Sequence, residues 1–407
     1  MDAGNVAELN TFLVLDAIRA GGQATRGQLS RELGLSEASV SRIARRLLAR
    51  GIVEEVPGEA SAPGRSPSIL RFVGPSGGVI AVDLGGTRCH GALADLAGAT
   101  VAEDSRSSGV GLEAATTLLE CIVALRLEAA KLGIPVRAIV VGIPALIDPG
   151  TGLAAAGPYV HWDGFDLIGL LRDNLEEPFE VDNDVNLAAL GQAWRGEGRS
   201  VHSFVTISLG TGIGGAVVVD GHLIRGRHNA AGEFGYFLMS PAQLHQDGQG
   251  RAGFEEVASG PAVRERAAAL MAQGTATSLD PASFGVADIF TAAKEGDEVG
   301  GQVVGELLDH VAVAIVGTTA LLDPERIILD GSLGRALEPW LDDLRAAVGA
   351  KVFAPPEVVV SGLGPNATVM GAIARALELV ADQEAPARVL RHSGGPAFSP
   401  SAPAARA

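Results

Sequence analysis

The sequence is poor in the residues that build disulfide frameworks, aromatic cores and membrane spans. Only two of its 407 residues are cysteines, Cys89 and Cys121, which excludes a disulfide framework and a multi-cysteine zinc site. Aromatic residues make up 4% of the chain, so its cores must consist mainly of Ala, Val, Leu and Ile. No uninterrupted apolar run reaches the roughly 18 residues of a membrane span, and the first residues do not read as a signal peptide. We therefore expect a cytoplasmic protein of two or three domains with no membrane partner.

Positive charge is also scarce overall, with 31 basic against 48 acidic residues and a formal net charge of −17. The deficit is uneven, because residues 1–75 carry a net charge of +1 and the remainder carries −18. Residues 26–50 alone hold six arginines and two glutamates. A basic module on an acidic body is typical of a protein that binds nucleic acid at one end, although a solvated helix face has the same composition.

Residues 9–50 have the pattern of a helix-turn-helix. Apolar residues at helical spacing predict a first helix that ends at a glycine pair. Thr25 and Gln28 form a capping box that starts a short second helix. Ser36 caps the next helix, which runs to about Arg50 and is the candidate recognition helix.

A wing is predicted to follow, from a strand over residues 51–56, a loop over 57–67 and a return strand over 69–73. Small polar side chains at the start of the recognition helix can approach base edges, and its arginines can reach phosphates or guanine. The candidate DNA-binding residues are Ser36, Ser39, Ser41, Arg42, Arg45, Arg46 and, at the tip of the wing, Arg65. The alternative is a three-helix module that binds protein. The period, caps, turn and wing all agree, so we expect DNA binding.

From residue 78 onward, strands alternate with helices and lead into glycine-rich loops. An apolar strand over residues 78–84 enters the run Asp-Leu-Gly-Gly-Thr at 83–87, and a second strand returns at 90–94. Residues 205–219 repeat this arrangement around Gly-Thr-Gly-Ile-Gly-Gly, which indicates an internal duplication. Such hairpins let the backbone approach a phosphate closely, although each alone can also be a tight turn. The candidate nucleotide-binding residues are Asp83, which could also hold a metal through water, Gly85, Gly86, Thr87, Gly210, Thr211, Gly212, Gly214, Gly215 and, after a third strand, Gly331.

Between the two hairpins, an apolar strand ends in carboxylates and amides at residues 179–186. Asn183 can orient sugar-like hydroxyl groups, and Asp184 can accept a proton as a general base. The alternative is a helix cap, since the sequence from Val185 to Trp194 reads as a helix.

Two further features concern the core. Residues 303–322 form an apolar, almost all-round helix, which is typical of a buried or interface helix, and we expect its His310 to be a core or interface residue. Cys89 and Cys121 are too far apart in sequence to be called a pair, and we expect both to be small buried residues.

Taken together, these motifs resemble those of the ROK family (repressors, open reading frames and sugar kinases) over residues 10–381. Gly-Glu-Phe-Gly at 232–235 and Ala-Ser-Gly-Pro at 258–261 add to the resemblance in the family's order and spacing. It implies an α/β architecture in which a winged helix-turn-helix precedes an actin-like ATPase body of two ribonuclease-H-like lobes. It also implies that Asp184 is the catalytic base and that the sugar contacts are Asn183, Asp184, Glu233, Tyr236 and Glu255.

The resemblance divides the chain into four parts. Residues 1–75 are the winged helix, residues 76–185 are the first lobe, and residues 186–365 are the second lobe. A helix at about 366–381 completes the first lobe. We expect the tail, residues 382–407, to be disordered because it is rich in Ala, Pro and Ser.

Two departures from the family pattern bear on the ligand. The family's histidine after Gly-Glu-x-Gly is Tyr236 in this chain, and the family's three cysteines are missing from residues 244–253. His245 and Asp247 do not make a zinc site by themselves. We therefore expect no zinc, no other resident metal and altered sugar contacts.

The resemblance implies a sugar-responsive transcriptional regulator, a homodimer or homotetramer that binds operator DNA and a sugar or sugar derivative. Repression and activation are both compatible with it. The second hypothesis is a glucokinase-like, ATP-dependent sugar kinase with an appended DNA-binding domain, which would use ATP and Mg²⁺. The missing zinc ligands and Tyr236 weigh against the kinase. A purely structural scaffold would leave the glycine loops unexplained.

Overall fold

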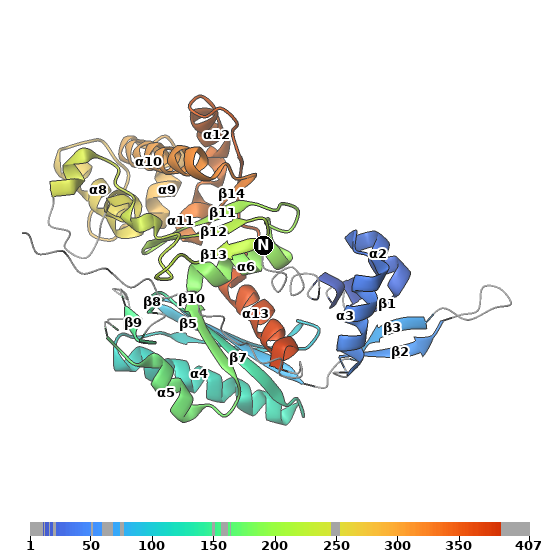
Figure 1. The fold of residues 1–407 in the computed structure, drawn as a ribbon. Coiled ribbons are helices and arrows are strands. Elements are labelled where there is room, and N and C mark those ends of the chain that lie inside the picture. The colour runs from blue at the N-terminus through green and yellow to red at the C-terminus, as the bar shows by residue number, and fades with distance from the viewer. Residues whose placement is uncertain are drawn as a thin grey trace, which may run out of the picture.

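The computed structural model describes residues 11–383, apart from residues 12, 16, 19–21, 50–51, 59–67, 74–76, 149–150, 156–161, 163 and 246–252. A small N-terminal domain stands beside two larger α/β lobes (Figure 1). The tail that we expect to be disordered lies outside the described residues from 384 onward, and residues 382–383 end the last helix.

The N-terminal domain is a winged helix, as the sequence predicts. The described residues between 11 and 18 are helical, and β3 pairs antiparallel with both β1 and β2. The capping box is confirmed, because the Gln28 amide donates to Thr25 Oγ1 at 3.2 Å and the Thr25 amide donates to Gln28 Oε1 at 2.9 Å. The wing-tip residue Arg65 lies outside the described residues. The elements are β1 (Gln23–Thr25), α2 (Arg26–Leu33), α3 (Glu37–Ala49), β2 (Val53–Pro57) and β3 (Ser68–Phe72).

The first lobe is built on a five-stranded sheet with the order β10-β7-β4-β5-β6. β4, β5 and β6 form an antiparallel meander, and β7 and β10 extend the sheet in parallel on the other side of β4. α4 and α5 cover one face, where Leu93, Leu118 and Ile139 are fully buried. The elements are β4 (Gly78–Leu84), β5 (Arg88–Asp95), β6 (Thr100–Ser107), α4 (Leu112–Lys131), β7 (Val136–Ile143), β8 (Leu146–Ile147), β9 (Ala154–Ala155), α5 (Leu167–Asn174) and β10 (Phe179–Asn183).

The second lobe repeats this topology with the order β13-β12-β11-β14-β15. β11, β12 and β13 form an antiparallel meander, and β14 and β15 extend the sheet in parallel on the other side of β11. The predicted duplication and the two-lobed body are therefore confirmed. The elements are β11 (Phe204–Leu209), β12 (Ile213–Val219), β13 (His222–Ile224), η1 (Phe234–Tyr236), η2 (Pro241–His245), α7 (Gly253–Ala258), α8 (Gly260–Ala272), α9 (Val286–Lys294), α10 (Glu298–Leu322), β14 (Arg326–Asp330), α11 (Gly331–Ala336), η3 (Glu338–Trp340), α12 (Leu341–Gly349), β15 (Glu357–Val360) and η4 (Gly364–Asn366).

Two helices form the layer between the sheets, α6 (Asp184–Arg195) and the C-terminal α13 (Ala367–Gln383) (Figure 1). Leu187 and Trp194 of α6 pack with α13 against the first sheet. Val185 and Ala189, on another side of α6, pack against the second sheet. Because α6 contacts both sheets, a shift of either lobe acts on the residues at its start. The domain boundaries drawn after residues 75, 185 and 365 stay predictions.

The apolar helix α10 begins more than a turn earlier than predicted, because Asp297 caps it by accepting from the Gly300 amide at 2.9 Å. Its length and hydropathy would suffice to cross a membrane. Packing accounts for its apolar residues, since Val303, Leu307 and Val311 are buried in the core of the second lobe. His310 is half-buried, and burial lowers its pKa, as expected of a core histidine.

Cys89 of β5 and Cys121 of α4 are both fully buried, as predicted. The fold also brings their thiols into contact, which their spacing in the sequence does not indicate. The pKa of the Cys121 thiol is raised by its hydrogen bond with Cys89 and by burial. The Cys121 thiol is therefore not activated as a nucleophile.

Phe72, at the end of β3, links the N-terminal domain to the body. Its ring packs against the winged-helix core and also against the apolar cluster in which α6 and α13 meet the first sheet. The contact lies near the start of the body, since β4 begins at Gly78. A displacement of α6 or α13 can therefore reach the wing through this side chain.

Candidate functional site

The first glycine loop closes the β4–β5 hairpin. Asp83 lies at the end of β4, and the Gly85 amide donates to the Arg88 carbonyl oxygen at 2.9 Å. Thr87 is exposed at the turn, and Gly85 and Gly86 are half-buried beside it. The loop is thus a tight turn with Thr87 exposed at it.

The second loop closes the β11–β12 hairpin and is held from outside. The Gly210 amide donates to the Gly212 carbonyl at 3.0 Å, and the Gly260 amide donates to the Gly210 carbonyl at 2.8 Å. Gly260 belongs to the Ala-Ser-Gly-Pro run, whose Ser259 caps α8. That run therefore positions the loop. Thr211 is exposed at its tip.

Packing also requires small residues in this loop. A Cβ on Gly215 would lie 2.2 Å from the Phe234 ring, and one on Gly214 would lie 2.8 Å from the Val185 side chain. The loop thus fits against both α6 and η1. Gly331 has a φ of +79°, which a residue with a side chain rarely adopts, and it begins α11 just after β14.

Asn183 and Asp184 lie at the junction of β10 and α6, where Asn183 caps the helix. Asn183 Oδ1 accepts from the amides of Val185 at 2.9 Å and Asn186 at 3.2 Å, so the helix-cap alternative is correct for this oxygen. No hydrogen bond of the Asn183 Nδ2 group is recorded among the described residues, so it can donate to a ligand. Asp184 is the first residue of α6 and is half-buried.

The second lobe supplies the other predicted sugar residues. Glu255 of α7 accepts from the Ile213 amide at 3.0 Å, which ties α7 to the start of β12. Glu233 is half-buried just before η1. Tyr236, at the end of η1, is 62% exposed, so its ring is not held by the core.

Electrostatics connect Asp184 to carboxylates of both lobes. The pKa of Asp184 is raised to about 7, mainly by burial and also by the charges of Glu233 and Asp182, which together outweigh the hydrogen bond from the Val185 amide. Burial, and then the charge of Asp184, holds the pKa of Asp83 well above its usual range. Residues separated by about 150 positions thus form one acidic site.

Burial also raises the pKa of two other carboxylates near Asp184 and Asp83, namely Glu233 and Asp330. Burial and the nearby charge of Glu255 raise the pKa of Glu233. Burial raises the pKa of Asp330, although the Gly331 amide at 2.7 Å and Arg335 at 3.2 Å partly offset this effect. Such carboxylates accept hydrogen bonds from sugar hydroxyl groups, and with a nucleotide's phosphates they could hold Mg²⁺. Within the described residues, no three or more His, Cys, Asp or Glu side chains group as metal ligands.

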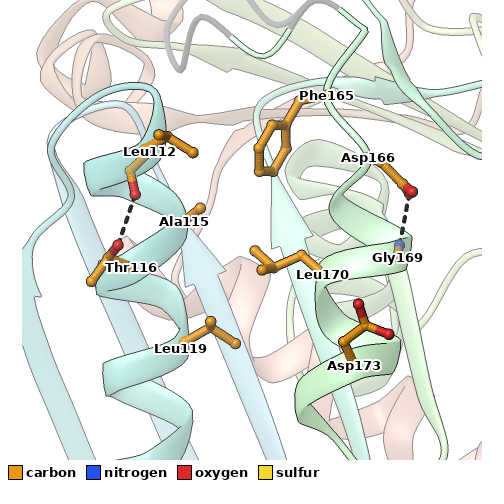
Figure 2. A pocket seen from close by; sticks show the side chains of 9 residues that line it. All are labelled: Leu112, Ala115, Thr116, Leu119, Phe165, Asp166, Gly169, Leu170 and Asp173. Atoms are coloured by element: carbon orange, nitrogen blue, oxygen red, sulfur yellow. Dashed lines mark hydrogen bonds between the residues drawn. The ribbon is translucent and has the colours of Figure 1, made fainter.

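A pocket of about 370 Å³ lies elsewhere, between α4 and α5 on the outer face of the first lobe (Figure 2). Leu112, Leu119 and Leu170 line it, with Phe165 above them and Asp173 below. None of the predicted sugar or nucleotide residues is among its lining residues.

The recognition helix α3 presents most of the predicted DNA-binding residues. Arg42 and Arg45 are exposed and Arg46 is half-buried. Ser36 Oγ accepts from the Ser39 amide at 3.2 Å and donates to Ser39 Oγ at 2.9 Å, so both serines fix the helix start. Ser41 is half-buried one turn later.

An ion pair that sequence reasoning missed fixes the wing to α2. Arg26 Nη1 lies 2.9 Å from Glu55 Oε1 and 3.0 Å from Ser68 Oγ. These residues come from α2, β2 and β3, and no local signal in the sequence relates them.

Comparison with known proteins decides the family. The ROK family model matches residues 79–378, which is most of the chain. This chain belongs to the ROK family. A model of the MarR family matches residues 8–62, the winged helix.

Relatives of this ROK protein include both regulators and kinases. It is 26% identical to the xylose repressor of Caldicellulosiruptor bescii over 90% of this chain and 95% of that protein. It is 24% identical to the N-acetylglucosamine repressor of Escherichia coli O157:H7 over 86% of each. It is 30% identical to the glucokinase of Halalkalibacterium halodurans, over 56% of this chain and 73% of that protein.

The similar solved structures also include both a regulator and a kinase. The fold resembles that of a ROK family transcriptional regulator, a homologue of the E. coli MLC protein, with a TM-score of 0.78 and 24% identity, over 93% of this chain and 98% of that chain. It also resembles the ROK family glucokinase of Streptomyces griseus, solved with glucose and AMPPNP, with a TM-score of 0.62 and 25% identity. That match covers 74% of this chain and 99% of the kinase, and so leaves much of this chain unmatched.

Proposed function

We propose that this protein is a sugar-responsive transcriptional regulator that binds operator DNA through its winged helix and a sugar or sugar derivative in the ROK body. The observation that carries the proposal is the arginine-bearing helix α3, with Arg42 and Arg45 exposed, in a MarR-like domain fused to a ROK body. The xylose and N-acetylglucosamine repressors match this chain over both parts. As a homodimer or homotetramer in the cytoplasm, it would place two winged helices on adjacent half-sites.

The ligand part of the proposal uses residues of both lobes. Asn183 and Asp184 stand at the start of α6, and Glu233 and Glu255 come from the second lobe. Such a ligand would change the affinity for DNA only by binding one arrangement of the lobes better than another. The layer of α6 and α13, with Phe72 against it, is the physical path that we propose for this change.

The DNA part is tested by replacing Arg42, Arg45 and Arg46 together with Ala. The variant should lose most of its affinity for the DNA upstream of its own gene, because these side chains would neutralise phosphates or read guanine. Its unfolding temperature and sugar binding should stay unchanged. The exposed arginines Arg172 and Arg264 of the body, changed to Ala, serve as the control. Unchanged DNA affinity in the triple variant would refute this placement of the recognition surface.

A sugar kinase is the second candidate, and the raised pKa of Asp184, about 7, favours it. A general base works best when its pKa lies near the working pH. ADP release from ATP and Mg²⁺ should be measured across glucose, xylose, N-acetylglucosamine and N-acetylmannosamine, with Asp184→Asn as the control. Turnover that vanishes in the control would make the protein a kinase with a DNA-binding domain. If no sugar gives turnover, the regulator remains as the proposed function.

We also propose that the protein holds no structural zinc. The support is the absence of cysteine from residues 244–253 and the position of His245 at the exposed end of η2. Asp247 lies outside the described residues. Metal analysis of the purified protein tests this proposal, and stoichiometric zinc would refute it.

A further inference from the structure

Arg225 joins the two lobes directly beside the proposed sugar site. It follows β13 in the second lobe, and its guanidinium group pairs with Asp182 of β10 in the first lobe. Arg225 Nη1 donates a hydrogen bond to Asp182 Oδ1 at 2.7 Å, and Nη2 lies 2.7 Å from Oδ2 as an ion pair. The Asp182 side chain is only 6% exposed, so little water competes for its charge.

The same carboxylate fixes the residues that follow it. Asp182 Oδ1 also accepts from the Asn183 amide at 2.8 Å and from Asn186 Nδ2 at 3.2 Å. Asn183 in turn caps α6. The charge on Arg225 therefore acts through Asp182 on the backbone of Asn183.

The main chain of Arg225 holds the opposite side of the site. Its carbonyl oxygen accepts from the Ala231 amide at 3.1 Å and closes the loop that leads to Glu233. In the same loop, Asn229 Nδ2 donates to the Ile147 carbonyl of β8 at 3.0 Å, which is a second tie to the first lobe. Arg225 is thus connected to Asn183 through its side chain and to the approach to Glu233 through its main chain.

The groups around Arg225 keep its guanidinium group ionised. Burial opposes the charge on Arg225, but its hydrogen bonds with Asp182 and the nearby charge of Glu180 outweigh burial and raise its pKa. Arg375 of α13 neutralises most of Glu180, with Nη2 at 2.8 Å, and also pairs with Glu378 at 3.0 Å. Arg225 and Asp182 therefore remain each other's principal partners.

We propose that Arg225 is a positioning residue, which fixes Asn183 of the first lobe relative to the Glu233 loop of the second and so sets the spacing of the two proposed sugar contacts. The inference about sugar contacts rests on the proposed sugar site. The positioning of Asn183 and of the Glu233 loop can be measured in the protein without ligand. Lysine cannot replace arginine fully here, because a single ammonium group does not place one nitrogen against each carboxylate oxygen of Asp182 as the planar guanidinium group does.

Hydrogen exchange of the ligand-free full-length protein tests whether Arg225 holds Asn183 and the Glu233 loop in place. Arg225→Leu should speed the exchange of amides 183–186 and 229–233 by about tenfold, since a buried charge loses its partner. The exchange rates of these amides in Arg225→Lys should lie between those of wild type and of Arg225→Leu. Arg266→Leu is the matched control, because it removes another arginine–carboxylate pair, with Glu306 at 2.7 and 2.6 Å, from the α8–α10 interface. It should leave these amides unchanged.

Calorimetric titration with D-xylose, D-glucose and N-acetyl-D-glucosamine tests whether this positioning affects sugar affinity. The sugar that the wild type binds should bind about tenfold more weakly to Arg225→Leu, with partial recovery in Arg225→Lys and none of the loss in Arg266→Leu. Asp182→Asn should weaken binding similarly, and the double variant Asp182→Asn, Arg225→Leu should be no worse than either single variant.

The two proposals fail separately. A wild type that binds none of the sugars counts against the proposed ligand, and hydrogen exchange then decides the role of Arg225. Unchanged exchange at 183–186 in Arg225→Leu overturns the inference, and so does sugar affinity within twofold of wild type. If Arg225→Leu does not fold, Asp182→Asn and Arg225→Lys carry the same test.

Discussion

Gly371 of α13 lies directly against the carbonyl oxygen of Leu187 in α6, so close that a Cβ on Gly371 would be 1.7 Å from that oxygen. The contact is reciprocal, since a Cβ on Gly191 of α6 would lie 2.3 Å from the Ala367 carbonyl. The two helices therefore meet backbone to backbone. This crossing sets the position of α6, whose first residue is Asp184.

Gly371→Ala should destabilise the protein by about 3 kcal/mol or more, because a helix must move before a methyl group fits. Denaturant unfolding measures the change. Gly301→Ala on α10 is the control, since nothing lies within 4 Å of its added Cβ, and it should be neutral or stabilising by up to about 1 kcal/mol. Equal unfolding midpoints for Gly371→Ala and wild type would contradict this packing.

Asp184 should make the protein less stable as the pH rises. Its pKa is about 7 in the folded protein against 3.8 ordinarily, so between these values the folded state holds a proton that the unfolded chain has lost. Its contribution is complete below about pH 4 and is lost as the pH passes 7. Asp184→Asn should therefore be more stable than wild type at pH 8, by about 1–3 kcal/mol, and similar at pH 4.

Unfolding curves at several pH values measure this difference, with the exposed Asp343→Asn as the control. Asp83, Glu233 and Asp330 have raised pKa values too, so part of the pH dependence should remain in Asp184→Asn. A constant stability difference between the variant and wild type from pH 4 to pH 8 would show that Asp184 does not titrate in this range.

Phe72→Ala should uncouple the winged helix from the body. Phe72 packs against both, so its loss should leave sugar affinity unchanged but reduce the effect of sugar on DNA affinity. Its cost in stability should be about 1–2 kcal/mol, since the ring is only half-buried. Fluorescence anisotropy with labelled DNA, with and without sugar, measures the coupling. Phe72→Leu should retain most of it, and full coupling in Phe72→Ala would exclude this path.

The two thiols should resist modification in the folded protein. Both are fully buried, and contact with Cys89 and burial raise the pKa of Cys121. Iodoacetamide at pH 8 should label them at least about a hundredfold more slowly than in the denatured chain, because the thiolate is the reactive form. Mass spectrometry follows the reaction. Rapid stoichiometric labelling of native protein would mean that the first lobe opens readily.

Local signals explain what the sequence could predict. The capping box at Thr25 and the two glycine hairpins are short-range patterns, and the structure has them where predicted. The helix-cap role of Asn183 also follows from its neighbours. Between β5 and β10 no element is predicted, whereas the structure has β6, α4, β7, β8, β9 and α5 there.

Contacts between distant residues could not be predicted in this way. Asp182 and Arg225 are 43 residues apart, and Gly371 meets α6 from the far end of the chain. Only the paired sheets and the returning helix α13 bring them together. Arg225 and Gly191 lie within segments that read as an ordinary strand end and helix, so nothing in the sequence distinguishes them.

The most direct test of the account is the affinity of the wild-type protein for the DNA upstream of its own gene, measured with and without each sugar at fixed salt. We predict that one sugar of the panel changes this affinity about fivefold or more, a typical coupling between two sites. Its effect should disappear when Asn183 and Asp184 are changed to Ala. Binding of a sugar with no change in DNA affinity would contradict the central claim.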